Sequence, residues 1–256
     1  MILTIDVGNT NINVGAFKDE KCVFISSLST EKLKLGDQYA CDFLNIFSLN
    51  GVSKSDFSGC IISNVVPELS HAIEGAVYKV TGLTPMTIGP GIKTGLNILA
   101  DNPAQLGADI VAGAVAAINK YPLPCLVIDL GTASKITALD KNGNFCGMII
   151  TCGVKVALDA LTKNASLLPN IRITAPKNVI GKNTIDCMQS GTVFGTASMI
   201  DGLIERFQDE MQDPIKSLVA TGGLSKNIIS NCKKEIIYDQ TLLLDGLRII
   251  YNKNKK

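Results

Sequence analysis

The sequence has few histidines, no paired cysteines, little net charge and no long apolar run, and each scarcity argues against a class of protein. It contains one histidine, His71, with no partner motif nearby, so a Ser-His-Asp triad or a Cys-His pair is not indicated. We expect His71 to be structural or exposed. The 8 cysteines form no Cys-x-x-Cys pair, which together with the single histidine argues against zinc. We expect these thiols to be reduced and mostly buried.

Charge and hydropathy indicate neither a nucleic-acid partner nor a membrane. The formal net charge is +1, so there is no basic excess to neutralise phosphates over a surface. No stretch is apolar and long enough to span a bilayer, and Met1 leads directly into an apolar run without the basic head of a signal peptide. We therefore expect a cytoplasmic protein. Its 46% hydrophobic content is ample for one large or two small domains.

The first fifteen residues are the most informative stretch. Residues 2–5 predict a buried strand that ends in Asp6, and the polar turn 8–11 leads into a second apolar strand, residues 12–17. Glycine lets a ligand approach the backbone, and the small polar residues supply N–H and O–H donors. A hairpin tip with a carboxylate suits a phosphate tail and its cation. An ordinary surface turn rich in Asx residues is the alternative.

The chain contains a second copy of this stretch, offset from the first by close to half of the chain length. Asp129 corresponds to Asp6, and Gly131 corresponds to Gly8, in an equivalent apolar hairpin. An internal repeat of this length indicates two related domains. The chain resembles the sugar kinase, heat-shock ATPase and actin superfamily in this respect. The resemblance implies an α/β fold of two duplicated ribonuclease H-like, actin-like ATPase domains, residues 1–120 and 121–256, with an interdomain ATP cleft.

The rest of the chain alternates between strand and helix patterns. In the first half we expect strands over residues 22–28, 59–63 and 86–89, and helices over residues 37–49, from Pro67, and over residues 109–119. In the second half we expect helices over residues 154–161, 185–211 and 242–251, a strand from Leu218 that ends in the double glycine 222–223, and a frayed basic tail over residues 252–256. The double glycine is either a nucleotide-contacting turn, as in the superfamily, or a plain strand-to-helix turn.

Several short motifs occur together in an order typical of one family. They are Asp6-x-Gly8-Asn9-Thr10-Asn11, Gly89-Pro90-Gly91, Asp101-Asn102-Pro103, Gly107-x-Asp109, Asp129-x-Gly131-Thr132-Ala133, Gly181-Lys182-Asn183-Thr184 and Thr221-Gly222-Gly223. Over nearly its whole length the chain resembles the type III pantothenate kinases. The resemblance implies transfer of the γ-phosphate of ATP to the primary hydroxyl of pantothenate, the first step of coenzyme A biosynthesis. It also implies Mg²⁺, a monovalent cation (K⁺ or NH₄⁺), and a dimer in which the partner helps to line the pantothenate pocket.

The resemblance also assigns roles to individual residues. Asp109 would be the general base that takes the proton of the attacking hydroxyl, although Asp109 also stands where it could cap a helix. Asp6 would hold Mg²⁺, and Asp129 would bind the monovalent cation. The implied nucleotide-binding residues are Asp6, Val7, Gly8, Asn9, Thr10, Asn11 and Thr132. The implied pantothenate-binding residues are Ala100, Gly107, Ala108, Asp109, Ile110 and Thr184.

The chain departs from the family pattern mainly on the substrate side. Ile110 stands where the family has Arg, which can contact an anionic substrate and stabilise transferring charge, whereas Ile can do neither. Ala100 stands in place of a Tyr. Further departures are Ser134, Lys135, Met148 and Cys152.

Three hypotheses follow from these departures. In the first, the chain is an active pantothenate kinase with an altered pocket. In the second, it is a non-catalytic or half-catalytic subunit that forms a heterodimer with a related chain. In the third, it is a regulatory ATP-binding protein, since some relatives are named as accessory transcription factors. Lys135 permits a narrower hypothesis: its ammonium replaces the monovalent cation if it lies near Asp129. Alternatively, Lys135 points from an alternating strand into solvent.

Overall fold

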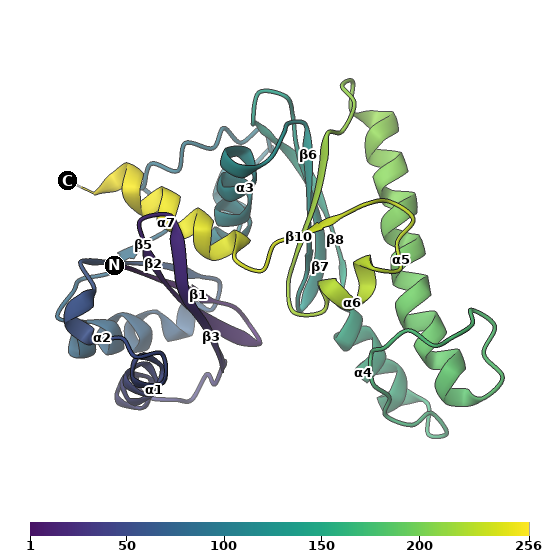
Figure 1. Cartoon of the computed structure of the whole chain (residues 1–256), viewed down its shortest axis with the longest axis horizontal. Helices are drawn as coiled ribbons and strands as arrows, with labels where there is room; N and C mark the ends of the chain where they lie inside the picture. The colour runs from purple at the N-terminus through teal and green to yellow at the C-terminus, as the bar shows by residue number, and fades with distance from the viewer. Residues whose placement is uncertain (256) are drawn as a thin grey trace. The chain divides into compact units, whose positions relative to one another are not determined.

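Two five-stranded sheets organise the chain, and each belongs to its own unit. The structure is a computed structural model that describes residues 1–255 (Figure 1). Unit 1 comprises Met1–Leu96, Asn102–Ala116 and the residues from Thr241 onward. Unit 2 comprises Asn97–Asp101 and Ala117–Gln240. The α/β class expected from the sequence is confirmed.

The sheet of unit 1 is built on the first strand of the chain. Its order is β3-β2-β1-β4-β5. The strands are β1 (Ile2–Val7), β2 (Asn11–Lys18), β3 (Lys21–Ser29), β4 (Gly59–Asn64) and β5 (Met86–Thr87). β1 pairs with β2 in antiparallel and with β4 in parallel orientation, so it lies at the centre of the sheet. The predicted opening hairpin is therefore present.

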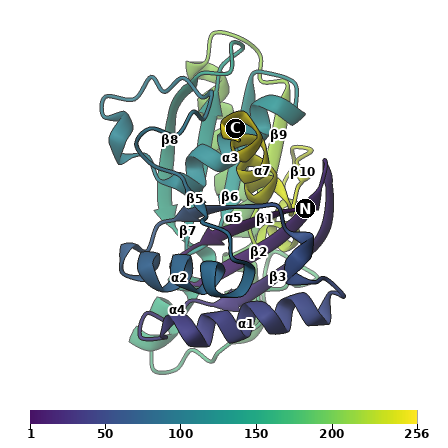
Figure 2. The ribbon, with the colours of Figure 1, turned by 90° about the vertical axis from the view of Figure 1, so that its left-hand side faces the viewer.

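Helices of unit 1 cover the sheet and fix which way each strand residue points. The helices are α1 (Gly36–Leu49), α2 (Ser70–Thr81), α7 (Leu242–Asn254) and α3 (Ala108–Lys120), of which the residues from 117 onward belong to unit 2. α1 and α2 lie side by side (Figure 2) and share a buried core with Leu3, Ile5 and Val7 of β1. Because side chains alternate along a strand, Thr4 and Asp6 face the opposite side. There α7 packs against β1, β4 and β2, and in β2 a Cβ at Gly15 would meet the side chain of Leu244.

Unit 2 repeats the same plan, which confirms the duplication read from the sequence. Its order is β10-β9-β6-β7-β8, and its central strand β6 pairs in antiparallel with β7 and in parallel with β9. The strands are β6 (Cys125–Leu130), β7 (Ala133–Leu139), β8 (Phe145–Cys152), β9 (Ser217–Thr221) and β10 (Ile237–Tyr238). The helices are α4 (Val154–Asn164), α5 (Thr184–Glu210) and α6 (Ser225–Ile229). Leu126, Ile128 and Leu130 face the core shared with α5, so Asp129 lies on the other face of its sheet.

The C-terminal segment differs from the sequence-based expectation. The tail predicted to fray from residue 252 is helical through Asn254. The side-chain amide of Asn254 stabilises it by two hydrogen bonds to the backbone of Lys93. Lys93 N donates to Asn254 Oδ1 and Asn254 Nδ2 donates to Lys93 O, each at 2.9 Å. Lys256, the end of that predicted tail, lies outside the described residues. α7 also belongs to unit 1, whereas a division at residue 120 assigns it to the second domain. Close packing explains this: a Cβ at Gly59 would overlap the ring of Tyr251.

Three other expectations need correction. The strand predicted over residues 86–89 has only two residues, and the helix predicted from Pro67 begins with the 3₁₀ turn η2 (Pro67–Leu69). Of the cysteines, only Cys60 and Cys125 are buried, so the expectation of mostly buried thiols was wrong. Burial raises the pKa of the Cys125 thiol to about 11, which keeps it protonated. In the part of the chain described, no helix combines the length and the apolar character needed to cross a membrane.

Replacing Gly246 with alanine should lower the free energy of unfolding. The new Cβ would overlap the carbonyl oxygen of Ala112 in α3, a backbone atom that cannot rotate away. We expect a loss of about 1–3 kcal/mol, the usual cost of overpacking, in urea denaturation. Gly75→Ala is the matched control, because a Cβ at this helical position in α2 meets nothing within 4 Å. It should be neutral or stabilising by up to ~1 kcal/mol. Equal stabilities of the two variants would contradict the close α3–α7 packing.

Candidate functional site

The first candidate residue, Asp6, is held near the end of the central strand of unit 1. Its side chain is 5% exposed, and in the parallel register with β4 it stands beside Ser63. The Ser63 hydroxyl is buried, and among the described residues it makes no hydrogen bond. A carboxylate buried to this degree is favourable only beside a cation or hydrogen-bond donors. Asp6 therefore has the character of a metal- or donor-binding carboxylate.

The turn after Asp6 is held in place by Thr30, the residue that follows β3. Gly8 N donates to Asn11 O at 3.0 Å, which closes the turn. Thr30 then binds both halves of it, because its N–H donates to Thr10 O at 2.9 Å and its hydroxyl donates to Gly8 O at 2.6 Å. Residues 9–11 remain exposed. The predicted nucleotide-binding turn thus presents polar groups on a backbone of fixed shape.

Asp109 lies in the first turn of α3, also in unit 1, and is half-buried. A Cβ at Gly107 would come within 2.5 Å of Asp109 Oδ1, so the carboxylate bends back over residue 107, where only glycine leaves space for it. A negative charge in the first turn is favoured by the helix dipole. Ile110 Cδ1 lies against the same place, 3.7 Å from that Cβ position. The geometry suits both a helix-stabilising carboxylate and one held ready to accept a proton.

The second hairpin places a lysine on its acidic residue. Asp129 in β6 and Lys135 in β7 are directly opposite in the antiparallel register. Lys135 Nζ lies 2.8 Å from Asp129 Oδ2, and the two side chains are 15% and 19% exposed. Of the two alternatives left open for Lys135, the structure excludes the one that points into solvent, because its ammonium lies near Asp129. In the first hairpin the position opposite Asp6 is held by the neutral Asn13.

Two backbone segments of unit 2 lie against the turn after Asp129. Gly131 N donates to Ala133 O at 3.2 Å, and Thr132 at the tip is exposed. A Cβ at Gly153 would overlap the carbonyl oxygens of Gly131 and Thr132. The first residue of the double glycine, Gly222, has φ of 99° and would place a Cβ 3.0 Å from Asp129 Oδ1.

These contacts add Gly153 and Gly222 to the site. The double glycine was a recognisable signal, whereas the role of Gly153 depends on a long-range contact that its own sequence neighbourhood does not reveal.

The residues expected to bind pantothenate are distributed over both units. Gly107, Ala108, Asp109 and Ile110 belong to unit 1, whereas Ala100 and Thr184 belong to unit 2. Thr184 is the first residue of α5 and is exposed. The preceding Asn183 caps this helix, because its Oδ1 accepts a hydrogen bond from Asp186 N at 2.9 Å.

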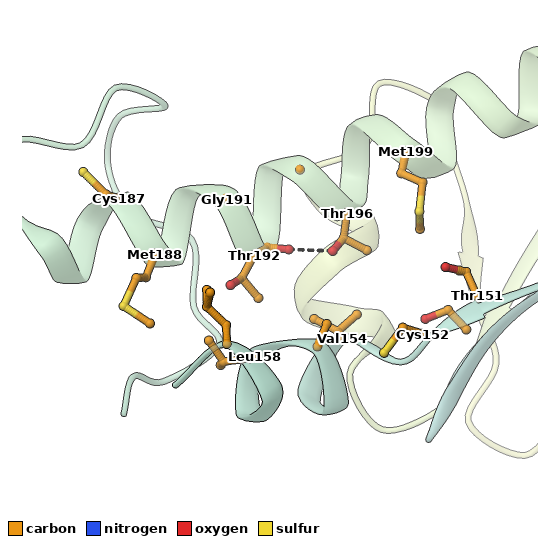
Figure 3. Close-up of a pocket in the computed structure, with 14 residues that line it drawn as sticks. Thr151, Cys152, Val154, Leu158, Cys187, Met188, Gly191, Thr192, Thr196 and Met199 are labelled. Carbon is orange, nitrogen blue, oxygen red and sulfur yellow. Dashed lines mark hydrogen bonds between the residues drawn. The ribbon is translucent and has the colours of Figure 1, made fainter. Parts of the chain in front are cut away.

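A separate cavity of about 550 Å³ lies between α4, α5 and the end of the β7–β8 pair. Figure 3 shows Leu158, Met188 and Met199 lining it, together with Thr196, whose hydroxyl donates to Thr192 O at 2.6 Å. None of the sequence-predicted site residues is among its lining residues. The predicted site is therefore not this cavity.

Comparisons with known proteins agree with this geometry. The family model described as type III pantothenate kinase matches residues 2–206. A curated relative, the type III pantothenate kinase of Halalkalibacterium halodurans, is 42% identical over 254 residues, which are 99% of this chain and 100% of the relative.

Solved structures show the fold. A Baf family transcriptional activator of Campylobacter jejuni has a TM-score of 0.61 at 20% identity, covering 98% of both chains. The activator of 2-hydroxyisocaproyl-CoA dehydratase from Clostridium difficile, with bound ADPNP, has a TM-score of 0.58 at 15% identity, covering 100% of this chain and 98% of that one. These neighbours confirm the actin-like ATPase fold. The family model and the full-length relative establish that the chain belongs to the type III pantothenate kinase family.

Proposed function

We propose that this chain transfers the γ-phosphate of ATP to pantothenate, the first step of coenzyme A biosynthesis, in the cytoplasm. The observation that carries the proposal is 42% identity to a curated type III pantothenate kinase over essentially the full length of both chains. The two hairpins, whose first strands carry Asp6 and Asp129 just before a polar turn, support ATP as the phosphoryl donor. Phosphoryl transfer needs positioning and charge neutralisation more than covalent chemistry, and rigid turns of this kind supply both.

In unit 1 we assign the phosphates and Mg²⁺ to the Asp6 turn. Magnesium prefers carboxylate oxygens and phosphate oxygens, and Asp6 is a buried carboxylate beside a turn with exposed polar groups at residues 9–11. These residues fit the ion. When bound, Mg²⁺ would neutralise charge on the transferring phosphoryl group. Thr30 contributes by holding the shape of the turn.

We assign Asp109 as the general base for the pantothenate hydroxyl. The carboxylate is half-buried and its direction is restricted by Gly107, which favours a defined position for proton acceptance. The backbone N–H groups at the start of α3 favour anions nearby. They matter more here because Ile110 cannot supply the positive charge of an arginine, a loss worth about 2–4 kcal/mol by analogy with removing one oxyanion donor.

In unit 2 we assign Thr132 and the double glycine at 222–223 to the nucleotide, and Ala100 and Thr184 to pantothenate. The tight approach of Gly222 to the Asp129 turn supports a site where backbone comes close to a ligand. The monovalent cation implied at Asp129 does not fit there, because the Lys135 ammonium already lies on that carboxylate.

We further propose that the active form is a dimer. Unit 2 exposes several large apolar side chains, which supports burial against a second subunit. They are Ile150, Leu161, Leu167, Val179, Ile180, Ile185 and Met199. The partner we propose is a second copy of this chain. The alternative is a related chain that carries the missing groups, and Ile110 and Ala100 are the residues that support it.

Asp109→Asn should abolish most of the pantothenate-dependent release of ADP. Loss of the base is expected to lower kcat by about 10²–10⁴-fold, while the affinity for ATP stays unchanged. Asp37→Asn is the matched control, because Asp37 also lies in the first turn of a helix of unit 1 but pairs on the surface with Lys79. Retained turnover in Asp109→Asn would refute the assignment. Absence of turnover in the wild type, with ATP still bound, would favour the divergent subunit.

Asp6→Asn should weaken the binding of a non-hydrolysable ATP analogue in the presence of Mg²⁺. Removing the carboxylate removes the proposed metal ligand, so we expect at least a tenfold loss of affinity, about 1.4 kcal/mol, by isothermal titration calorimetry. Without Mg²⁺ the difference should disappear. Asp19→Asn is the control: Asp19 lies at the β2–β3 turn with φ of 55°, a conformation that asparagine tolerates. A Mg²⁺-independent loss in Asp6→Asn would contradict a metal-binding role.

A further inference from the structure

We propose that the Lys135 ammonium is a built-in cation at the second hairpin, so that this chain needs no monovalent cation at Asp129. The inference rests on the proposed function as an ATP-dependent kinase, and it concerns how charge is balanced beside the Asp129 turn. It predicts a phosphotransferase whose nucleotide affinity and turnover do not respond to K⁺.

The geometry of the pair carries the proposal. Asp129 and Lys135 occupy facing positions of β6 and β7, so their side chains leave the same face of the sheet. Nζ lies 2.8 Å from Oδ2, the distance of a charge-assisted hydrogen bond. Both side chains are more than four-fifths covered, which reduces screening by salt compared with a surface pair.

The duplication supplies an internal comparison. In the first hairpin the residue opposite Asp6 is Asn13, a neutral amide whose Oδ1 accepts a hydrogen bond from Ser27 at 2.8 Å. The same backbone plan therefore carries an amide opposite one acidic residue and an ammonium opposite the other. The chain itself therefore supplies a cation opposite the second carboxylate, whereas the residue opposite the first is uncharged.

The surroundings of Asp129 also disfavour a second cation. Cβ positions at Gly131 and Gly222 would lie 3.6 Å and 3.0 Å from Asp129 Oδ1, so both glycines approach this oxygen closely and neither offers it a side-chain ligand. A bound K⁺ would have to share the Asp129 carboxylate with the Lys135 ammonium. Two cations on one carboxylate lie close together and repel each other strongly.

The Lys135 ammonium can replace a potassium ion because the two groups carry the same charge. An ammonium and a potassium ion both carry one positive charge, and lysine acts on phosphates as a point charge. Unlike an ion from solution, Lys135 is always present at its site. Neutralisation there is independent of the salt composition around the protein.

The test compares the wild-type chain in KCl and in tetramethylammonium chloride at equal ionic strength. Three quantities are measured: pantothenate-dependent release of ADP, affinity for a non-hydrolysable ATP analogue with Mg²⁺, and the melting temperature with that analogue bound. We expect each to be the same in both salts, with less than a twofold change in rate or affinity.

Lys135→Thr should create a cation requirement where there was none. In tetramethylammonium chloride we expect at least a tenfold loss of analogue affinity and turnover, and in KCl a saturable recovery, with a K⁺-dependent rise in melting temperature. Lys141→Thr is the matched control, because it removes an exposed ion pair with Asp213 in the same unit. It should behave as the wild type in both salts.

A saturable rise of wild-type affinity, turnover or melting temperature with K⁺ would overturn the proposal, as would a Lys135→Thr chain with no K⁺ response in any readout. If the Lys135→Thr variant does not fold, the comparison of the wild-type chain in the two salts still tests the proposal. If the wild type shows no turnover with pantothenate, the proposed function fails, while analogue affinity and melting temperature still test Lys135.

Discussion

The burial of a carboxylate at the end of a central strand is the constraint on which the candidate site depends. A charge removed from water is costly unless a cation or several donors lie beside it, so such a position persists only when its surroundings supply compensation. Asp6 occupies such a position, and Asp129, which is partly covered, occupies the equivalent position in unit 2. At Asp129 the compensating positive charge belongs to the chain itself, as the ammonium of Lys135. At Asp6 the opposite residue is neutral, which suits an ion that arrives with the nucleotide.

Close backbone approach then gives each unit its detailed shape. In unit 1, Gly246 allows α7 to contact α3, and Gly59 leaves space for Tyr251 of α7. The C-terminal helix therefore packs against the sheet that the N-terminal strands form. In unit 2, Gly153 and Gly222 bring two further segments against the turn after Asp129. In both units the glycines replace side-chain packing with backbone contact, and the polar turns keep one fixed geometry.

Much of this could be predicted from the sequence, and what could not has a common physical cause. The hairpins, the repeat and the long helix α5 follow from local apolar patterns and from glycines beside acidic residues, and these were confirmed. Alternation in a strand left open whether Lys135 faces solvent or Asp129, because it fixes the spacing of faces but not which face is covered. The helical end at Asn254 and the role of Gly153 depend on contacts far apart in the sequence, which no local pattern encodes.

The most direct test of the account is to identify the product. Purified chain, ATP, Mg²⁺ and pantothenate are incubated in a buffer free of K⁺, and the mixture is followed by ³¹P NMR. The account predicts a phosphate monoester resonance of 4'-phosphopantothenate that grows in step with ADP, without any added monovalent metal ion. ADP without the ester, or neither product from a chain that still binds Mg²⁺ and ATP, would contradict it.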